Sequence, residues 1–235
     1  TGLYPGQLDL STGDGRLDVS LAGEGVFEVV VINEILADPP TGEGGDANQD
    51  GTRSSSEDEF VELLNIGRFA VNISGWQLSD RGASEASRFQ FPDPTWADPG
   101  ERLVLFGGGQ PFGFEGKVFI DDGKIGGGLS NSGDGVFLIA DGDTVAQAEY
   151  GSEAGKDQSL IRNPEGRGGF AFHADLPGKG SRFSPGKPRI VLSEIELSPL
   201  DTSLEIGSSF VFGTSGLFTD ASRSSLSEGL LFSVT

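Results

Sequence analysis

The sequence predicts an all-β fold, a β-sandwich, and three observations carry this prediction. Apolar and polar residues alternate in short runs, which is the two-residue period of a strand and not the 3.6-residue period of a helix. Turn-forming residues separate these runs about every ten residues. Glycine is abundant, at 38 of 235 residues, and 17 phenylalanines join the β-branched residues at the apolar positions. Short strands joined by glycine turns are typical of sandwiches and barrels.

The first 27 residues predict a hairpin. Two alternating runs, Leu8-Asp-Leu10 and Leu17-Asp-Val19, flank the turn at residues 13–15, which reads Gly-Asp-Gly. Two strands alone are marginally stable in water, so we expect this hairpin to pack on another element.

The centre of the chain predicts a series of short strands. Residues 27–36 form a dense β-branched run, typical of a buried strand. Residues 60–65 fit either a helix or a strand, and the turn at Asn65-Ile-Gly67 favours a strand because it leaves little room for a helix. Further strands are predicted at 68–73, 75–79, 87–91, 101–106, 117–120, 135–140, 143–150, 158–162 and 169–173. Residues 174–189, rich in Gly, Pro and Lys, predict a linker, and residues 190–235 predict further short strands.

The charge excludes several classes of partner. The formal net charge is −20, from 36 acidic against 16 basic residues. Such a surface repels phosphate backbones and anionic lipids, so we expect no nucleic-acid partner and no membrane insertion. No apolar run approaches the roughly 18 residues that span a bilayer. High acidity favours divalent-cation binding instead.

The candidate catalytic groups are sparse, so we expect no enzymatic activity. His173 is the only histidine and there is no cysteine, which leaves few ways to build a nucleophile–base pair or a zinc site. Acid pairs such as Glu59 with Glu62 or Asp121 with Asp122 are expected by chance in so acidic a chain. The glycine runs 107–109 and 126–128 lack the lysine of a phosphate loop.

The most specific chemical signal is an acidic loop at residues 46–57. It reads Asp-Ala-Asn-Gln-Asp-Gly-Thr-Arg-Ser-Ser-Ser-Glu, with oxygen ligands at loop positions 1, 3 and 5, Gly at 6 and Glu at 12. This spacing matches the EF-hand calcium loop, in which alternate residues turn their oxygens inward around the ion. The predicted Ca²⁺ ligands are Asp46, Asn48, Asp50, Thr52, Ser54 and Glu57, with Asp58 as an alternative last ligand. The competing interpretation is an acidic surface loop without an ion.

The strands around the acidic loop change its predicted role. An EF-hand sensor would place a helix on each side, whereas the sequence predicts strands there. We therefore expect Ca²⁺ to stabilise a long insertion between two strands and not to act as a signal.

A series of short stretches in residues 28–189 carries a family resemblance. These stretches are, in order, Ile32–Ile35, Gly45–Asn48, Asp58–Leu63, Ser74–Asp80, Pro99–Val104, Leu129–Asp134, Gln158–Arg162 and Phe183–Gly186. Together they resemble a bacterial lamin tail domain, an immunoglobulin-like β-sandwich family, and occur in that family's order. The resemblance implies an immunoglobulin-like fold without catalytic residues, used as an architectural or binding unit on secreted or surface proteins. In such a fold Trp76 is expected to fill the space between the sheets, whereas Trp96, beside prolines, is expected to be exposed.

The two ends of the chain resemble complementary parts of another domain. Residues 190–235, through Ile195–Phe210, are similar to the opening half of a bacterial group 2 immunoglobulin-like domain, and residues 1–27 to its closing strands. The terminal segments are therefore expected to form a second, partial immunoglobulin-like sandwich. The strands of one copy could complete the next copy, the chain could be cut from a longer one, or both ends could meet within one chain.

These expectations together predict a structural protein. The chain is expected to be an extracellular or cell-surface module of a secreted bacterial protein, stabilised by Ca²⁺. Its partners would be other copies, in a head-to-tail filament formed by β-strand donation, or neighbouring domains of a longer chain. The alternative is a glycan-binding accessory domain of a secreted multidomain enzyme.

Overall fold

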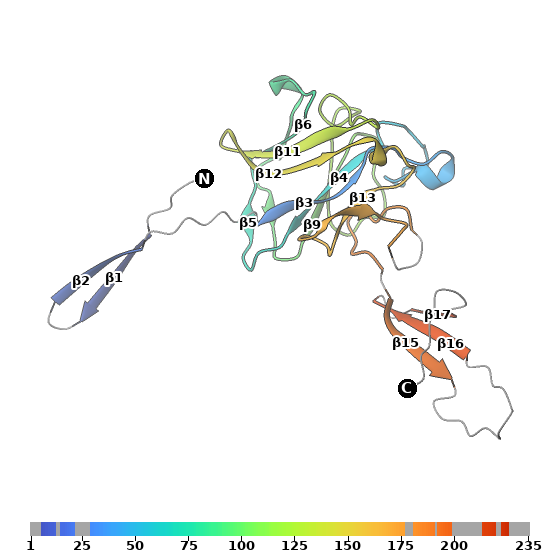
Figure 1. The fold of residues 1–235 in the computed structure, drawn as a ribbon. Coiled ribbons are helices and arrows are strands. Elements are labelled where there is room, and N and C mark those ends of the chain that lie inside the picture. The colour runs from blue at the N-terminus through green and yellow to red at the C-terminus, as the bar shows by residue number, and fades with distance from the viewer. Residues whose placement is uncertain are drawn as a thin grey trace, which may run out of the picture.

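The computed structural model describes residues 6–12, 15–21, 29–176, 181–190, 192–198, 213–219 and 222–225. These residues form 17 strands and three single-turn 3₁₀ helices, η1 Glu43–Gly45, η2 Glu85–Ser87 and η3 Ser152–Ala154. Figure 1 shows the strands gathered into a central sandwich with a small sheet toward each end of the chain. None of the described helices is long and apolar enough to cross a membrane. The predicted all-β fold class is confirmed.

Two antiparallel sheets make the central sandwich, with one parallel pair between β10 and β9. A short ribbon of β5 and β8 lies beside them. The larger sheet has the order β10-β9-β4-β3-β13-β14, with β10 Lys117–Ile120, β9 Arg102–Phe106, β4 Phe60–Asn65, β3 Val30–Leu36, β13 Leu160–Asn163 and β14 Gly169–Phe172. The smaller sheet has the order β12-β11-β6-β7, with β12 Asp143–Tyr150, β11 Asp134–Ala140, β6 Gln77–Asp80 and β7 Phe89–Gln90; the ribbon strands are β5 Val71–Asn72 and β8 Trp96–Ala97.

The main core lies between the two sheets. Alternate residues of β3 and β4, such as Ile35 and Val61, face this core together with Leu78 and Leu138 from the smaller sheet. A second cluster lies on the other face of β3, β4 and β9, where Phe60 contacts Phe106 at a ring-centroid distance of 5.7 Å. Loops cover this second cluster, so β3 and β4 are buried on both faces. That double burial explains why their sequences are almost continuously apolar.

Most strand predictions are confirmed, and residues 60–65 form strand β4 and not a helix. The sequence did not predict strand β8, because its two residues, which lie close to prolines, are too few to show a periodic pattern. Trp76 is half-buried against the main core, whereas the centre is filled by smaller side chains and Phe91. Trp96 is 48% exposed, as predicted.

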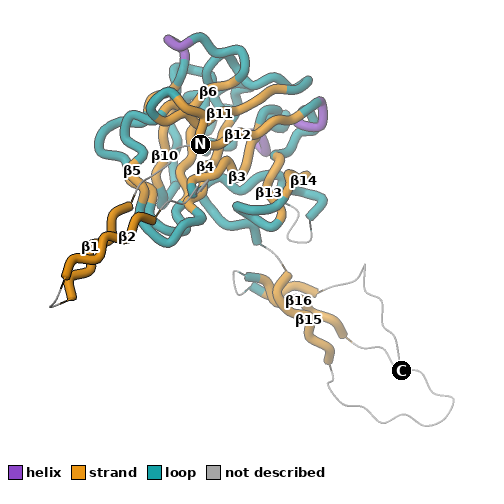
Figure 2. The backbone as a smooth tube through the Cα atoms, turned by 60° about the vertical axis from the view of Figure 1, so that its left-hand side comes forward, coloured by secondary structure: helices purple, strands orange, loops and turns teal. Residues whose placement is uncertain are grey.

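The terminal segments form two further sheets. Strands β1 Gly6–Thr12 and β2 Gly15–Leu21 pair as the predicted hairpin. Strands β15 Leu192–Ser198, β16 Gly213–Phe218 and β17 Arg223–Ser225 form a three-stranded antiparallel sheet. Among the described strands, neither sheet shares a backbone ladder with the sandwich or with the other. Figure 1 shows both small sheets apart from the sandwich, and Figure 2 shows the same for the C-terminal sheet.

Candidate functional site

The acidic loop leaves β3 and coils before it enters β4. The side chains of Asp46 and Asn48 turn toward the same point, because Asp46 Oδ1 and Asn48 Oδ1 both accept from the Asp50 N–H, at 3.1 and 3.0 Å. Asp46 Oδ2 accepts from the Gly51 N–H at 2.9 Å. Gly51 has a φ of 89°, a conformation that glycine adopts without strain. The first half of the loop therefore curls around the side-chain oxygens of Asp46 and Asn48.

A neighbouring loop, residues 107–112, is fastened to this coil. Asp50 Oδ2 accepts from the Gln110 N–H at 3.0 Å, and the Asn48 side-chain amide donates to the Gly108 carbonyl at 3.3 Å. A Cβ atom on Gly109 would lie 2.3 Å from Asn48 Nδ2 and 2.5 Å from Asp50 Oδ2. Only glycine fits at position 109, because the two loops approach so closely. The hydrogen bonds and this close contact join the two loops.

The second half of the loop is organised by Asp58. This residue is fully buried, and its carboxylate accepts from the Asn48 N–H at 3.0 Å and the Ser54 N–H at 2.7 Å. Burial raises the pKa of Asp58, against the lowering effect of these hydrogen bonds. Ser54 Oγ accepts from the Glu57 N–H at 3.2 Å, and Thr52 is exposed. Asp58 therefore ties the two halves of the loop together.

The chemistry of the loop fits Ca²⁺, which takes six to eight oxygen ligands from carboxylates, amides, hydroxyls and backbone carbonyls. Of the first three candidate ligands, Asp46 and Asn48 direct oxygens at the Asp50 N–H, and the Asp50 carboxylate accepts from the Thr52 N–H. Within the described residues, no three Asp, Glu or His side chains converge closely enough to hold a metal by themselves. An ion in this loop would therefore use the amide, carbonyl and hydroxyl oxygens as well. The seven predicted ligands remain a prediction.

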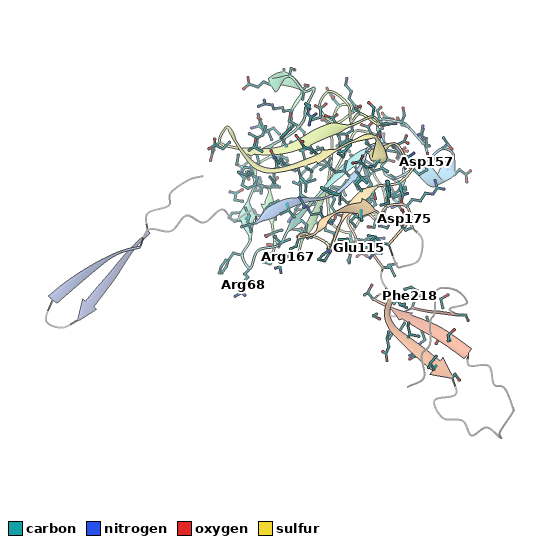
Figure 3. The ribbon with its side chains drawn as sticks, viewed as in Figure 1. Arg68, Glu115, Asp157, Arg167, Asp175 and Phe218 are labelled. Atoms are coloured by element: carbon teal, nitrogen blue, oxygen red, sulfur yellow. The ribbon has the colours of Figure 1, made fainter. Side chains whose placement is uncertain are left out.

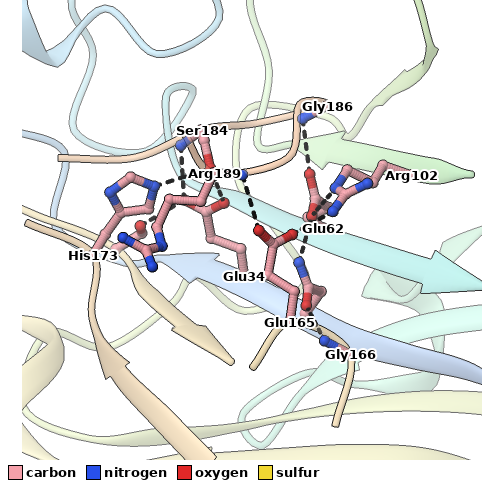
Figure 4. A network of polar contacts seen from close by, with 11 residues as sticks. Glu34, Glu62, Arg102, Glu165, Gly166, His173, Ser184, Gly186 and Arg189 are labelled. Atoms are coloured by element: carbon pink, nitrogen blue, oxygen red, sulfur yellow. Dashed lines mark hydrogen bonds and ion pairs between the residues drawn. The ribbon is translucent and has the colours of Figure 1, made fainter. Parts of the chain in front are cut away.

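A second site, which sequence reasoning missed, lies under residues 181–190. Two glutamates on neighbouring strands, Glu34 of β3 and Glu62 of β4, are fully buried and face this segment (Figure 4). Glu62 accepts from the Asn33 side-chain amide at 2.8 Å and from the Gly186 N–H at 2.8 Å, and Arg102 Nε lies 3.4 Å away. Burial, reinforced by the neighbouring Glu34, raises the pKa of Glu62 well above its usual value.

Glu34 is linked to His173 through Ser184. His173 Nδ1 lies 2.7 Å from the Ser181 carbonyl, so Nδ1 carries a proton and donates it. His173 Nε2 lies 2.9 Å from Ser184 Oγ, which lies 2.9 Å from Glu34 Oε2. Two hydrogen bonds along this relay need two protons, and the Ser184 hydroxyl supplies only one. The second proton is carried either by His173 Nε2 or by the Glu34 carboxyl group, so the pair is not a neutral His173 beside an ionised Glu34. Burial raises the pKa of Glu34, and the nearby His173 lowers it.

These carboxylates fix the segment that leads to the C-terminal sheet. Glu34 accepts from the Ser184 N–H, and Glu165 Oε1 accepts from the Arg189 N–H at 2.9 Å. Together with the Gly186 contact, three backbone N–H groups of residues 184–189 bind three glutamates; we call this arrangement the clasp. The prediction of a linker at 174–189 is therefore wrong for residues 181–189, because these hydrogen bonds hold them on the sandwich; residues 177–180 lie outside the described residues. The signal in the sequence was a glutamate in the middle of each of two apolar strands.

A third group of carboxylates holds the glycine-rich loop after β10. Glu59, Asp80 and Asp134 are all buried, and burial with the charges of Asp134 and Asp80 raises the pKa of Glu59 to about 8. Burial raises the pKa of the Tyr150 hydroxyl, and the charges of Asp134, Glu59 and Asp80 add to this effect. The bonds are Gly126 N–H to Asp121, Gly127 N–H to Asp80, Leu129 N–H to Glu59 and Ser130 N–H to Asp134.

The acid pair Glu59 and Glu62 contacts two separate segments of the fold. Glu59 and Glu62 are both buried and bind different segments, residues 126–130 and the clasp. His173, the only histidine of the sequence, is buried at 3% exposure with both ring nitrogens hydrogen-bonded. Each of these groups acts on the backbone of a neighbouring segment.

A comparison with known families agrees with this fold. The lamin tail domain model matches residues 27–152, which is more than half of the 235 residues. A search of curated proteins gave no match. This β-sandwich is a non-enzymatic domain type. The chain belongs to the lamin tail domain family.

Proposed function

We propose that the chain is a calcium-stabilised structural module of a secreted or surface-attached bacterial protein, which assembles head-to-tail with other copies. The observation that carries the proposal is the division into three sheet systems. A central sandwich is closed around its own two core clusters, and a small sheet follows at each end of the chain.

The terminal sheets supply the reason to assemble. A two-stranded hairpin is marginal in water unless it packs on something else. Among the described strands, β1 and β2 pair only with each other, and β15, β16 and β17 only among themselves. Joining the N-terminal strands of one copy to the C-terminal sheet of the next would complete a sandwich. A head-to-tail contact of this kind does not close on itself, so it builds a filament.

The acidic loop supplies the proposed calcium site. In support, Asp46 and Asn48 direct side-chain oxygens at the same Asp50 N–H, and Asn48 and Asp50 bind the 107–112 loop. An ion bound there would neutralise part of an acidic surface and stiffen two loops at once. Calcium in this role stabilises the sandwich and does not signal.

Sedimentation velocity over a hundredfold range of protein concentration, with electron microscopy of the most concentrated sample, tests assembly. We expect species that grow with concentration and linear particles in the images. A single monomeric species throughout would overturn head-to-tail assembly. It would leave a spacer between neighbouring domains as the structural role.

A glycan-binding accessory domain is the second candidate, favoured by exposed aromatic side chains. Phe69 is 82% and Trp96 48% exposed, and aromatic rings of this kind stack on sugar faces. A glycan array probed with the wild type and with Trp96→Ala distinguishes the candidates. A specific hit that Trp96→Ala abolishes would support the accessory domain.

A further inference from the structure

The register of the N-terminal hairpin sorts its residues into two faces of opposite character. Residues that pair across an antiparallel ladder share a face, and the face alternates along each strand. Leu8 pairs with Val19 and Leu10 with Leu17, so four apolar residues fall on one face. The other face holds the polar pairs Gln7 with Ser20, Asp9 with Asp18 and Ser11 with Arg16.

The C-terminal sheet has the same division. A bulge after Leu192 shifts the register, which brings Leu192 onto the same face as Ile195 and Leu197. Phe218 of β16 pairs with Leu192 at the end of this face (Figure 3). Ile195 is 45% exposed.

The opposite face of the C-terminal sheet carries the charged residues. Glu194 and Glu196 of β15 lie there, and Arg223 of β17 forms an ion pair with Glu196; the one apolar residue of β16 on this face is Leu217, which pairs with Glu194. Ser215 Oγ also donates to Glu196, at 3.3 Å. The apolar residues of β15 are thus confined to one side of the sheet.

We propose that the apolar face of the β1–β2 hairpin packs on the apolar face of β15 and β16 in a second copy of the chain. This inference rests on the proposed assembly and names its two surfaces. The contact would be face to face, with two strands covering three, as in the two layers of a sandwich. Edge pairing alone would leave both apolar faces in water.

Length and charge support this partner. Strands β1, β2 and β15 each have seven residues, so the two layers match in length. The polar faces carry Asp9 and Asp18 on the hairpin and Glu194 and Glu196 on the sheet. Burying these faces against each other would oppose like charges without solvent, which is costly. Only the apolar faces can meet without that cost.

Engineered disulfides test the two surfaces directly, because the chain contains no cysteine. The hairpin receives one cysteine, as Leu8→Cys, Leu10→Cys or Val19→Cys, and a separately tagged copy receives Ile195→Cys. Each pair is mixed under oxidising conditions. We expect at least one pair to form a disulfide between differently tagged chains. Ser11→Cys, on the polar face of the hairpin, is the matched control and should not link to Ile195→Cys.

The double variant Leu10→Cys/Ile195→Cys distinguishes one copy from two. A ladder of linked oligomers supports contact between copies, whereas a cross-linked monomer would overturn it. If the wild type assembles but none of the three hairpin positions links to Ile195→Cys, the surfaces named here are wrong and assembly itself stands. If the wild type remains monomeric at every concentration and no link forms, the inference and the proposed assembly both fail.

Charge on the hairpin provides a second, independent measurement. Leu17→Asp places a carboxylate on the apolar face, and Ser20→Asp places one on the polar face. We expect Leu17→Asp to abolish assembly in sedimentation and Ser20→Asp to leave it unchanged. Thermal unfolding of the central sandwich serves as the folding control. Equal assembly by both variants would overturn the face assignment.

Discussion

The acidic loop and the clasp use the same chemistry in two different settings. In both, carboxylates accept hydrogen bonds from backbone N–H groups of a segment without regular secondary structure. In the loop the partners are at most five residues apart for Asp46, whereas Glu62 binds Gly186 across 124 positions and Glu34 binds Ser184 across 150. Local pairing leaves a pattern in the sequence, and distant pairing leaves none.

The two settings also differ in solvation. Asp46 and Asp50 are half-exposed, so water shares their charge, whereas Glu34 and Glu62 are fully buried. A buried carboxylate without its partners costs several kcal/mol, and an exposed one costs little. The clasp should therefore be the more sensitive of the two to a single substitution.

Glu62→Ala should have the largest effect of the variants considered. It removes the acceptor for the Asn33 amide and the Gly186 N–H, while Arg102 keeps its ion pair with Glu165. Each of the two donors left unpaired costs about 1–3 kcal/mol, so we expect a loss of about 2–6 kcal/mol in the free energy of unfolding. Chemical denaturation monitored by tryptophan fluorescence measures it.

Glu149→Ala is the matched control for that variant. Glu149 pairs with Arg81 at 2.9 Å, but its side chain is 64% exposed, so its removal should cost about 0–1 kcal/mol. If the two variants lost the same free energy of unfolding, burial would not increase the contribution of the clasp to stability.

Calcium removal should come next in size, and it tests the acidic loop. An ion that binds only the folded state stabilises it by about 3–4 kcal/mol when its concentration exceeds the dissociation constant a few hundred- to a thousandfold. We expect a lower melting temperature in chelator and a smaller shift in Asp50→Ala. An unchanged melting temperature in chelator would show that Ca²⁺ does not stabilise this loop.

Ser184→Ala tests the relay between His173 and Glu34. The variant keeps the Ser184 N–H bond to Glu34 but removes the hydroxyl that joins the two side chains. A buried donor and acceptor left unpaired cost about 1–3 kcal/mol, measured by denaturation. Ser87→Ala, at an exposed hydroxyl, should stay within about 0.5 kcal/mol. If Ser184→Ala lost no more stability than Ser87→Ala, the relay would contribute nothing to stability.

The difference between the two regions also marks what the sequence can predict. The β-sandwich, the strand at 60–65 and the coil at Asp46–Asp50 follow from periodicity and local spacing, which the chain shows directly. The clasp does not, because residues 181–189 are rich in Pro and polar residues, as a linker is. Their binding also depends on strands more than 120 positions away. Glu34 and Glu62 were visible as polar residues in apolar strands, but nothing local identifies their partners.

The pH dependence of stability should show the smallest effect when it is expressed per pH unit. It extends the comparison of buried and exposed carboxylates to Glu59. Its pKa is raised from 4.5 to about 8 in the folded protein, so the folded state binds a proton that the unfolded state has lost between these values. Stability therefore falls as pH rises from about 4.5 through about 8, by at most about 1.4 kcal/mol per pH unit for one proton. Glu59→Gln, which cannot ionise, should flatten this slope between about pH 6 and 8, whereas Glu153→Gln, at an exposed carboxylate, should not. If stability changed with pH equally in wild type and in Glu59→Gln, Glu59 would be ionised in its buried position. Its charge would then be stabilised as fully as that of a half-exposed carboxylate in the acidic loop.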